Sequence, residues 1–165
     1  MRMFNLLLTT TLFAMSGSFS LSAHAADGAI KVTSIAQIEV EVVDKKGKKT
    51  LKRTPVDKAV PGTEVIYTTT FVNLINKPVN DIVINNPIPN NTEYKAGSVF
   101  GKDCEILFSA DGGKTFGHAE ELKVMDAEGK EHTALPGEYT HIRWNYRVPL
   151  AAGKSGEVGF RAVIK

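Results

Sequence analysis

The stretch from Val60 to Val99 constrains the fold most, because it combines a β-type sequence pattern with many turn-forming residues. The dipeptide Pro61-Gly62 is a turn signal, and the run from Val65 to Val72 behind it is rich in β-branched and aromatic residues. This run predicts a strand. Alternate side chains of a strand share a face, and the face that we expect to enter the core carries Val65, Tyr67, Thr69 and Phe71.

The second half of the stretch predicts a short strand over Asp81 to Ile84, followed by a surface crossing from Asn85 to Asn91. Pro87 and Pro89 remove backbone hydrogen-bond donors, and the asparagines favour local bonding to the backbone. We therefore expect this crossing to be neither a helix nor a central strand.

A series of turn and strand motifs runs through this stretch, and a similar pair of strands closes the chain. The motifs are Pro61-Gly62-Thr63, Asn73, Asp81 to Ile84, Pro87-Ile88-Pro89, Gly97-Ser98, Trp144 and Pro149 to Val163. Their order resembles the bacterial surface repeat family catalogued as domain of unknown function number eleven. The resemblance covers roughly Val60 to the C-terminus, with a less typical insertion in the middle. One departure is Asn86, where the family commonly places an acidic residue.

This resemblance implies an immunoglobulin-like β-sandwich on an exported or cell-surface protein. It brings no catalytic residues that could be carried over to the chain.

The N-terminal segment has the three parts of a secretory signal peptide. A positive start at Met1-Arg2 precedes an apolar segment from Met3 to Ala14, and small residues end in Ala23-His24-Ala25. We predict cleavage after Ala25, which leaves residues 26–165 as one domain in the periplasm, secreted or on the cell surface. The alternative is an uncleaved anchor, but the apolar segment is short for a bilayer and is interrupted by threonines.

Charge and cysteine content exclude two further classes of protein. The chain has 20 Lys and Arg against 18 Asp and Glu, a net charge of +2 that falls to +1 when Arg2 leaves with the signal. Such a balance produces no overall field that would steer nucleic acid or a membrane to the chain. Cys104 is the only cysteine, so no intramolecular disulfide is possible. It alternates with Ile106 and Phe108, which predicts a buried, inert thiol rather than a reactive or dimer-forming one.

The first long segment of the mature chain predicts a hairpin with a basic tip. Ile38, Val40 and Val42 alternate with polar residues as in a half-buried strand, a turn follows at Asp44 to Lys48, and Lys49 to Thr54 forms the return arm. The basic residues of this hairpin are Lys45, Lys46, Lys48, Lys49, Lys52 and Arg53.

Two interpretations of these basic residues stay open. They are a contact site for an anionic surface, such as lipopolysaccharide or an acidic partner protein, or a solvated tip whose lysines discourage edge-to-edge aggregation. Aromatic residues do not alternate with the charges, which argues against binding of single-stranded nucleic acid.

The middle of the chain holds one other specific motif. Ser109, Asp111, Gly113, Thr115 and Phe116 match the Asp-box pattern Ser-x-Asp-x-Gly-x-Thr-aromatic, which resembles the hairpin turns of sialidase-type propellers. A propeller repeats its motif in every blade, and this motif occurs once. We therefore predict a structural turn rather than a sialidase. A calcium ion held by Asp111 or by the turn at Asp126 to Glu128 is the alternative.

The strand expected over Glu138 to Val148 carries Trp144 on its core face and His141, Arg143, Asn145 and Arg147 on the other face. The second face is either an ordinary exposed polar surface or a site for a carboxylate or phosphate. The histidines lack metal-site spacing, and the chain contains no nucleophile elbow and no phosphate-binding loop.

The sequence thus predicts an all-β chain with little or no helix, folded as a single immunoglobulin-like antiparallel β-sandwich behind a cleaved signal peptide. The expected function is a non-enzymatic structural or protein-interaction domain of the bacterial envelope. We expect a monomer with no cofactor, no metal, no nucleic acid and no integral membrane segment, which contacts an envelope or surface protein. The alternatives are a module that binds a small ligand or carbohydrate, which requires exposed aromatics, and a hydrolase, which requires paired carboxylates in a cleft.

Overall fold

The computed structural model describes residues 22–24 and 28–165, which form strands, turns and one 3₁₀ turn at Pro136–Glu138. The prediction of an all-β chain is therefore confirmed. The predicted cleavage site after Ala25, and the predicted signal peptide apart from Ser22–His24, lie outside the described residues.

The strands form two main sheets and a small ribbon. The first sheet has the order β1, β5, β11 and β8, with bounds Ser22–His24, Val83–Pro87, His141–Tyr146 and Cys104–Ser109. The second has the order β3, β2, β4, β12 and β6, with bounds Lys49–Pro55, Ile30–Val43, Glu64–Asn73, Ser155–Ile164 and Thr92–Tyr94. Short β7 (Phe100–Gly101) also pairs with β12, and β9 (Lys123–Met125) pairs with β10 (Glu131–Thr133).

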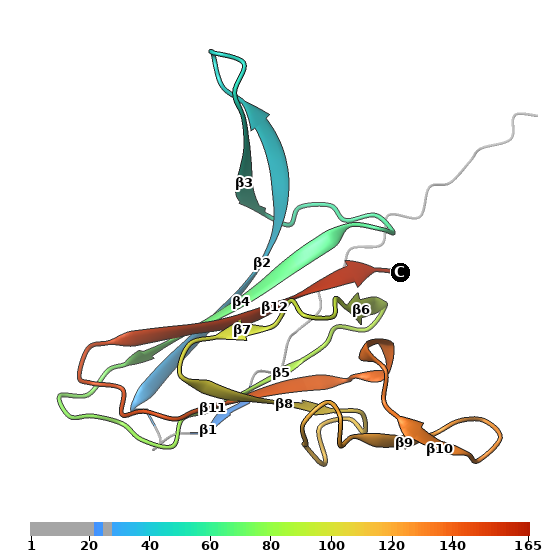
Figure 1. Cartoon of the computed structure of the whole chain (residues 1–165). Coiled ribbons are helices and arrows are strands. Elements are labelled where there is room, and N and C mark those ends of the chain that lie inside the picture. Colours follow the sequence, from blue (N-terminus) through green and yellow to red (C-terminus); the bar gives the residue numbers. More distant parts are fainter. Residues whose placement is uncertain (1–21, 25–27) are drawn as a thin grey trace, which may run out of the picture.

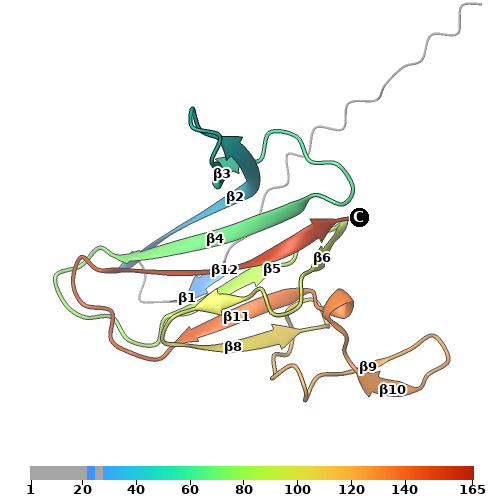
Figure 2. The ribbon, with the colours of Figure 1, turned by 45° about the horizontal axis from the view of Figure 1, so that its top comes forward.

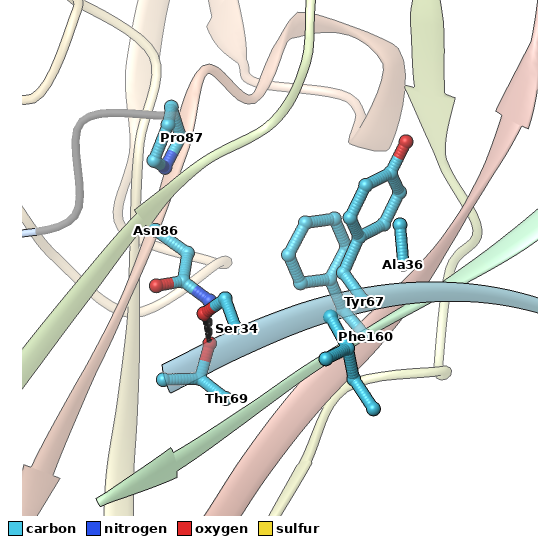
Figure 3. Close-up of a pocket in the computed structure, with 8 residues that line it drawn as sticks. Ser34, Ala36, Tyr67, Thr69, Asn86, Pro87 and Phe160 are labelled. Carbon is cyan, nitrogen blue, oxygen red and sulfur yellow. Dashed lines mark hydrogen bonds between the residues drawn. The ribbon is translucent and has the colours of Figure 1, made fainter. Parts of the chain in front are cut away.

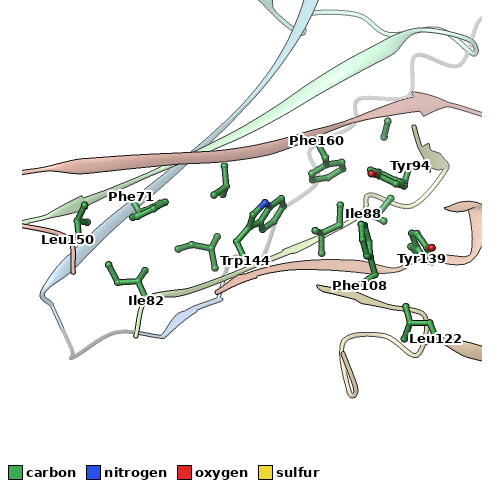
Figure 4. Packing of buried hydrophobic residues seen from close by; sticks show 14 of the residues in the cluster. Phe71, Ile82, Ile88, Tyr94, Phe108, Leu122, Tyr139, Trp144, Leu150 and Phe160 are labelled. Atoms are coloured by element: carbon green, nitrogen blue, oxygen red, sulfur yellow. The ribbon is translucent and has the colours of Figure 1, made fainter. Parts of the chain in front are cut away.

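The two main sheets lie face to face as a β-sandwich, which the two ribbon views show as separate layers (Figures 1 and 2). All their described strand pairs are antiparallel. Aromatic and aliphatic side chains from both sheets fill the space between the layers (Figure 4). This apolar layer is the main interaction between the sheets, since each Å² of apolar surface removed from water adds about 25 cal/mol to the stability of the fold.

Trp144 on β11 is the centre of that layer. Its side chain is fully buried, its ring lies 6.4 Å from the ring of Phe160 on the opposite sheet, and its Nε1 donates a 3.0 Å hydrogen bond to the Phe100 carbonyl. A Cβ at Gly101 would lie 2.7 Å from Trp144 Cδ1, so only glycine leaves room for the indole there.

Strand β4 follows the predicted pattern in the part that enters the core. Val65 and Phe71 are buried, Tyr67 packs against the core, and Thr69 is buried on the same face. On the opposite face, Ile66 and Thr68 are also buried. The alternation of the sequence did not indicate this second buried patch.

The prediction for Asn85 to Asn91 is wrong at its beginning. Strand β5 starts at Val83 and continues to Pro87, so it includes Asn85 and Asn86 and lies between β1 and β11. Pro87 is tolerated because β1 pairs only with residues 83–85 and β5 ends at Pro87. Asn91 at the end of the crossing has a φ of 61°, a left-handed conformation that asparagine accepts better than most residues.

Residues 22–24 and 28–165 include no helix with the length and apolar composition needed to cross a bilayer.

Candidate functional site

The hairpin of β2 and β3 projects from the sandwich (Figure 1). Only residues 30–37 of β2 pair with β4, whereas residues 37–43 pair with β3. Beyond Gln37 the hairpin therefore leaves the main sheet. None of residues 38–55 belongs to the described core cluster. We call residues 38–55 the arm.

The tip of the arm is a tight turn fixed by its own acidic residue. Asp44 Oδ1 accepts hydrogen bonds from the backbone nitrogens of Lys46 at 2.8 Å and Lys48 at 2.9 Å. Gly47 has a φ of 78°, which only glycine adopts without strain. The turn therefore spreads the three tip lysines on a defined loop.

The six basic residues of the arm divide into two groups. Lys49 pairs with Glu41 at 2.9 Å, and Arg53 pairs with Glu39 at 3.4 Å, both across the hairpin. The other four are Lys45, Lys46, Lys48 and Lys52, which are exposed and, within the described residues, have no carboxylate within ion-pair distance. The arm thus presents four amines that no carboxylate of the described part of the chain neutralises.

Apolar side chains accompany these amines. Val43 and Leu51 are 56% and 69% exposed, and Val42 is also exposed, whereas Ile38 and Val40 keep an intermediate exposure. The expectation of a half-buried strand thus does not hold at Val42, because no second layer covers the arm there. The arm therefore exposes apolar as well as charged side chains.

An ionic cluster fixes the base of the arm to the sandwich. The Arg161 guanidinium on β12 donates to both carboxylate oxygens of Glu39 and to Glu64, and Lys95 pairs with Glu64 at 2.5 Å. The hydrogen bonds from Arg161 and Arg53 hold the pKa of Glu39 below its usual value, and those from Lys95 and Arg161 do the same for Glu64. Sequence reasoning missed this cluster, because its members come from four distant segments.

The Asp-box residues form a closed local network. Asp111 accepts hydrogen bonds from the Ser109 hydroxyl, from the backbone nitrogens of Lys114 and Thr115, and from the Thr115 hydroxyl. These bonds hold the pKa of Asp111 well below its usual range. The Asp111 oxygens are thus used by the turn itself. Gly113 has a φ of 83° and packs under the His141 ring.

Phe116 links the Asp-box to the outer face of the first sheet. The Arg143 guanidinium lies 3.7 Å above the Phe116 ring, and its Nε donates to Asn85 Oδ1 at 2.8 Å. Next to it, Arg147 and Asn145 both donate to Glu105. The polar groups that could have bound an external anion are therefore engaged within the chain.

A cleft of about 380 Å³ lies between the asparagine-rich crossing and the Asp-box turn. Its walls include Pro89, Asn90, Asn91, Tyr139 and His141. Burial lowers the pKa of His141, while the charge of Asp111 opposes this shift. The cleft therefore presents neutral amide and ring groups at neutral pH.

A second, smaller pocket of about 60 Å³ opens between the two sheets beside β5 (Figure 3). Strand β2 contributes the small residues Ser34 and Ala36 to this pocket, whereas Ile30 and Val32 of the same strand pack against the core. Asn86 donates from Nδ2 to Thr69 Oγ1 at 2.7 Å, but its buried Oδ1 has no hydrogen-bond partner among residues 22–24 and 28–165. This pocket was not predicted, since it arises from the packing of strands far apart in sequence.

Cys104 is partly buried and faces the interior opposite Tyr146. Burial, with a contribution from Asp103, raises the pKa of its thiol to about 11. In the described part of the chain, no group of three or more His, Cys, Asp or Glu side chains is arranged to hold a metal ion.

No model of a known protein family matches the chain, and no curated protein matches it. The resemblance to domain of unknown function number eleven therefore stays a prediction.

Proposed function

We propose that this chain is a non-enzymatic interaction domain of the bacterial envelope, whose arm docks on an acidic surface of a partner protein. The observation that carries the proposal is the arm itself. It stands clear of the sandwich, and its four lysines without a carboxylate partner among the described residues lie on the same hairpin as exposed Val42, Val43 and Leu51. Charge complementarity selects an acidic partner, and the apolar residues select a protein rather than a free anion. The location in the envelope rests on the predicted signal peptide.

The ionic cluster supports this proposal, because docking requires a presented surface. Arg161 joins Glu39 on the arm to Glu64 on the sandwich, and the arm therefore leaves the body at a defined angle. A preordered element loses less conformational freedom on binding, which improves affinity without any added contact.

The test is a crosslinking pull-down from intact envelopes. The variant changes Lys45, Lys46, Lys48 and Lys52 to glutamine, and the matched control changes four other exposed lysines, Lys77, Lys102, Lys114 and Lys154. Both variants lose four positive charges. We expect a defined acidic envelope protein with the wild type and the control, and its loss with the arm variant and at high salt. Equal recovery with both variants would refute docking through the arm.

A small-ligand module is the second candidate, and the cleft beside Asn90, Asn91 and His141 favours it. Its volume of about 380 Å³ falls within the usual range for ligand sites. The amide and imidazole groups of its lining suit a neutral ligand that carries hydroxyl or amide groups, such as a sugar. Titration of the protein with neutral oligosaccharides, followed by NMR of the Asn90 and Asn91 side-chain amides, tests this candidate.

A further inference from the structure

One side of β5 pairs with β11, and the other side pairs with β1, a strand from the N-terminal segment. β1 pairs antiparallel with β5 in the register Ser22 with Asn85, Ala23 with Ile84 and His24 with Val83. This strand belongs to the segment that we predict is removed after Ala25. Cleavage would therefore leave β5 as an edge strand in the mature protein.

We infer that in the mature protein this edge binds an extended, uncharged segment of a partner protein, which adds to the first sheet in the place of β1. The inference rests on the predicted signal cleavage and not on the arm, since β5 and the arm belong to different sheets.

The backbone of β5 is prepared for such an addition. The Ile88 nitrogen donates to Thr140, and the Ile82 carbonyl accepts from Tyr146, so the even-numbered residues direct their backbone groups toward β11. In an antiparallel ladder the neighbouring residues direct theirs the opposite way. Val83 and Asn85 therefore offer N–H and C=O groups to the outer edge, while Pro87 offers no N–H and ends the pairing.

Along β5, no charged side chain opposes strand addition. Proteins guard exposed edges with charges, and the edge strand of the other sheet, β3, carries Lys49, Lys52 and Arg53. In contrast, β5 has the sequence Val-Ile-Asn-Asn-Pro, without a charge. Such an edge suits an uncharged strand, and β1, with the sequence Ser-Ala-His, carries neither a carboxylate nor an amine.

The pocket beside β5 explains how one side chain of the partner would be recognised. Asn86 lies on the inward face and lines the pocket together with Ala36, Tyr67 and Phe160. Paired residues share a face of the sheet, so a strand in the β1 register that extends one residue further places a side chain opposite Asn86, pointing inward. The apolar walls and the volume of about 60 Å³ favour a small apolar side chain there.

The first step of the test is the intact mass of the protein purified from cells that express the whole chain. We expect an N-terminus at Ala26. A mature protein that retains residues 22–24 would overturn the inference, because its edge would stay covered by its own strand.

The second step adds a synthetic peptide with the sequence of residues 18–25, SFSLSAHA, to the processed protein at millimolar concentration. We expect hydrogen exchange of the Val83 and Asn85 amides to slow at least tenfold, with no change at β3. A peptide with proline in place of both Ser22 and His24, the residues paired with Asn85 and Val83, loses the N–H groups that face β5; it is the control and should give no protection. Unchanged exchange at Val83 and Asn85, or equal protection with the proline peptide, would overturn the inference.

The third step identifies the occupant in envelopes. Val83→Lys places a charge at this edge, and the matched control Met125→Lys places one on β9, outside both the arm and β5. After circular dichroism shows that both variants fold, we expect only Val83→Lys to lose a crosslinked partner that the arm variant keeps. Dimers of the processed protein that Val83→Lys abolishes would instead make a second copy the occupant and overturn the inference. Loss of the partner with the arm variant alone would support docking through the arm and refute the edge.

Discussion

Arg161 on β12 and Glu39 on β2 are joined by two hydrogen bonds, of 3.0 and 3.1 Å, although β4 lies between their strands. The pair reaches across the outer face of the second sheet to the point where the arm leaves it. A bidentate contact of this kind fixes direction as well as distance. The angle of the arm is therefore set by this pair as well as by the backbone of β2.

Arg161→Met tests that relation. We expect faster hydrogen exchange of the amides of residues 38–43, because the arm loses its tie to the sandwich, while exchange in β4 changes little. The control is Lys165→Met, which removes the exposed pair of Lys165 with Glu93 at 3.6 Å, far from the arm. Unchanged exchange in the arm of Arg161→Met would show that the hairpin backbone alone holds its angle.

Gly159→Ala is expected to destabilise the sandwich. A Cβ at this position would lie 2.4 Å from the Tyr67 carbonyl oxygen and 2.6 Å from the Phe100 ring. Because the first contact is with the backbone, β12 has to move away from β4, and overpacking of this kind costs about 1–3 kcal/mol. Urea denaturation measures the loss. At Gly137 the nearest atom is the flexible Glu93 carboxylate at 3.2 Å, so Gly137→Ala is the control with a smaller loss.

Asp111→Asn should make the free energy of unfolding less dependent on pH in the acid range. The pKa of Asp111 is held below its usual value by hydrogen bonds from Thr115 and Ser109. The unfolded chain, with an aspartate pKa of about 3.9, binds a proton before the folded protein does. The ionised carboxylate therefore stabilises the fold above about pH 3.9, the pKa of the unfolded chain. This stabilisation is lost as the pH falls from that value toward the lower pKa of the folded protein.

Free energies of unfolding from pH 7 to pH 2.5 test this expectation. Asp111→Asn should be less stable than the wild type at pH 7, and the gap should narrow below pH 4. A constant gap would mean that the side chain acts through its shape and not through its charge.

The Cys104 thiol should react slowly in the folded protein. Its pKa of about 11, raised by burial and by Asp103, leaves little thiolate at pH 8. We expect the reaction with a disulfide reagent to be at least tenfold slower in the native protein than in guanidinium, where the pKa returns to about 8.5. Equal rates in both states would contradict a protected thiol.

The sequence predicted well those features that depend on neighbours along the chain. The alternation of Val65, Tyr67, Thr69 and Phe71 depends on strand geometry alone, and the structure directs these residues inward. The hairpin turn after Val43 was also predictable, because it depends on hydrogen bonds from nearby backbone nitrogens to Asp44 and on the backbone conformation of Gly47. In these cases the deciding interactions lie within a few residues of each other.

Features that depend on distant segments were not predictable in this way. Pro87 was expected to exclude a central strand, but its position at the end of β5, past the residues that pair with β1, removes the penalty. The approach of Arg161 to Glu39 needs the register of three strands, and the pocket at Asn86 needs the distance between two sheets. None of these quantities is encoded in a periodic pattern.

The separation of the arm from the core has a consequence for the variability of the domain. Residues 38–55 contribute nothing to the described apolar layer, so substitutions and length changes there leave the sandwich free to fold. Under the proposed docking role, changes within residues 38–55 can therefore alter the choice of partner while the sandwich stays the same. The sequence of the sandwich would then diverge slowly, and that of the arm would diverge faster.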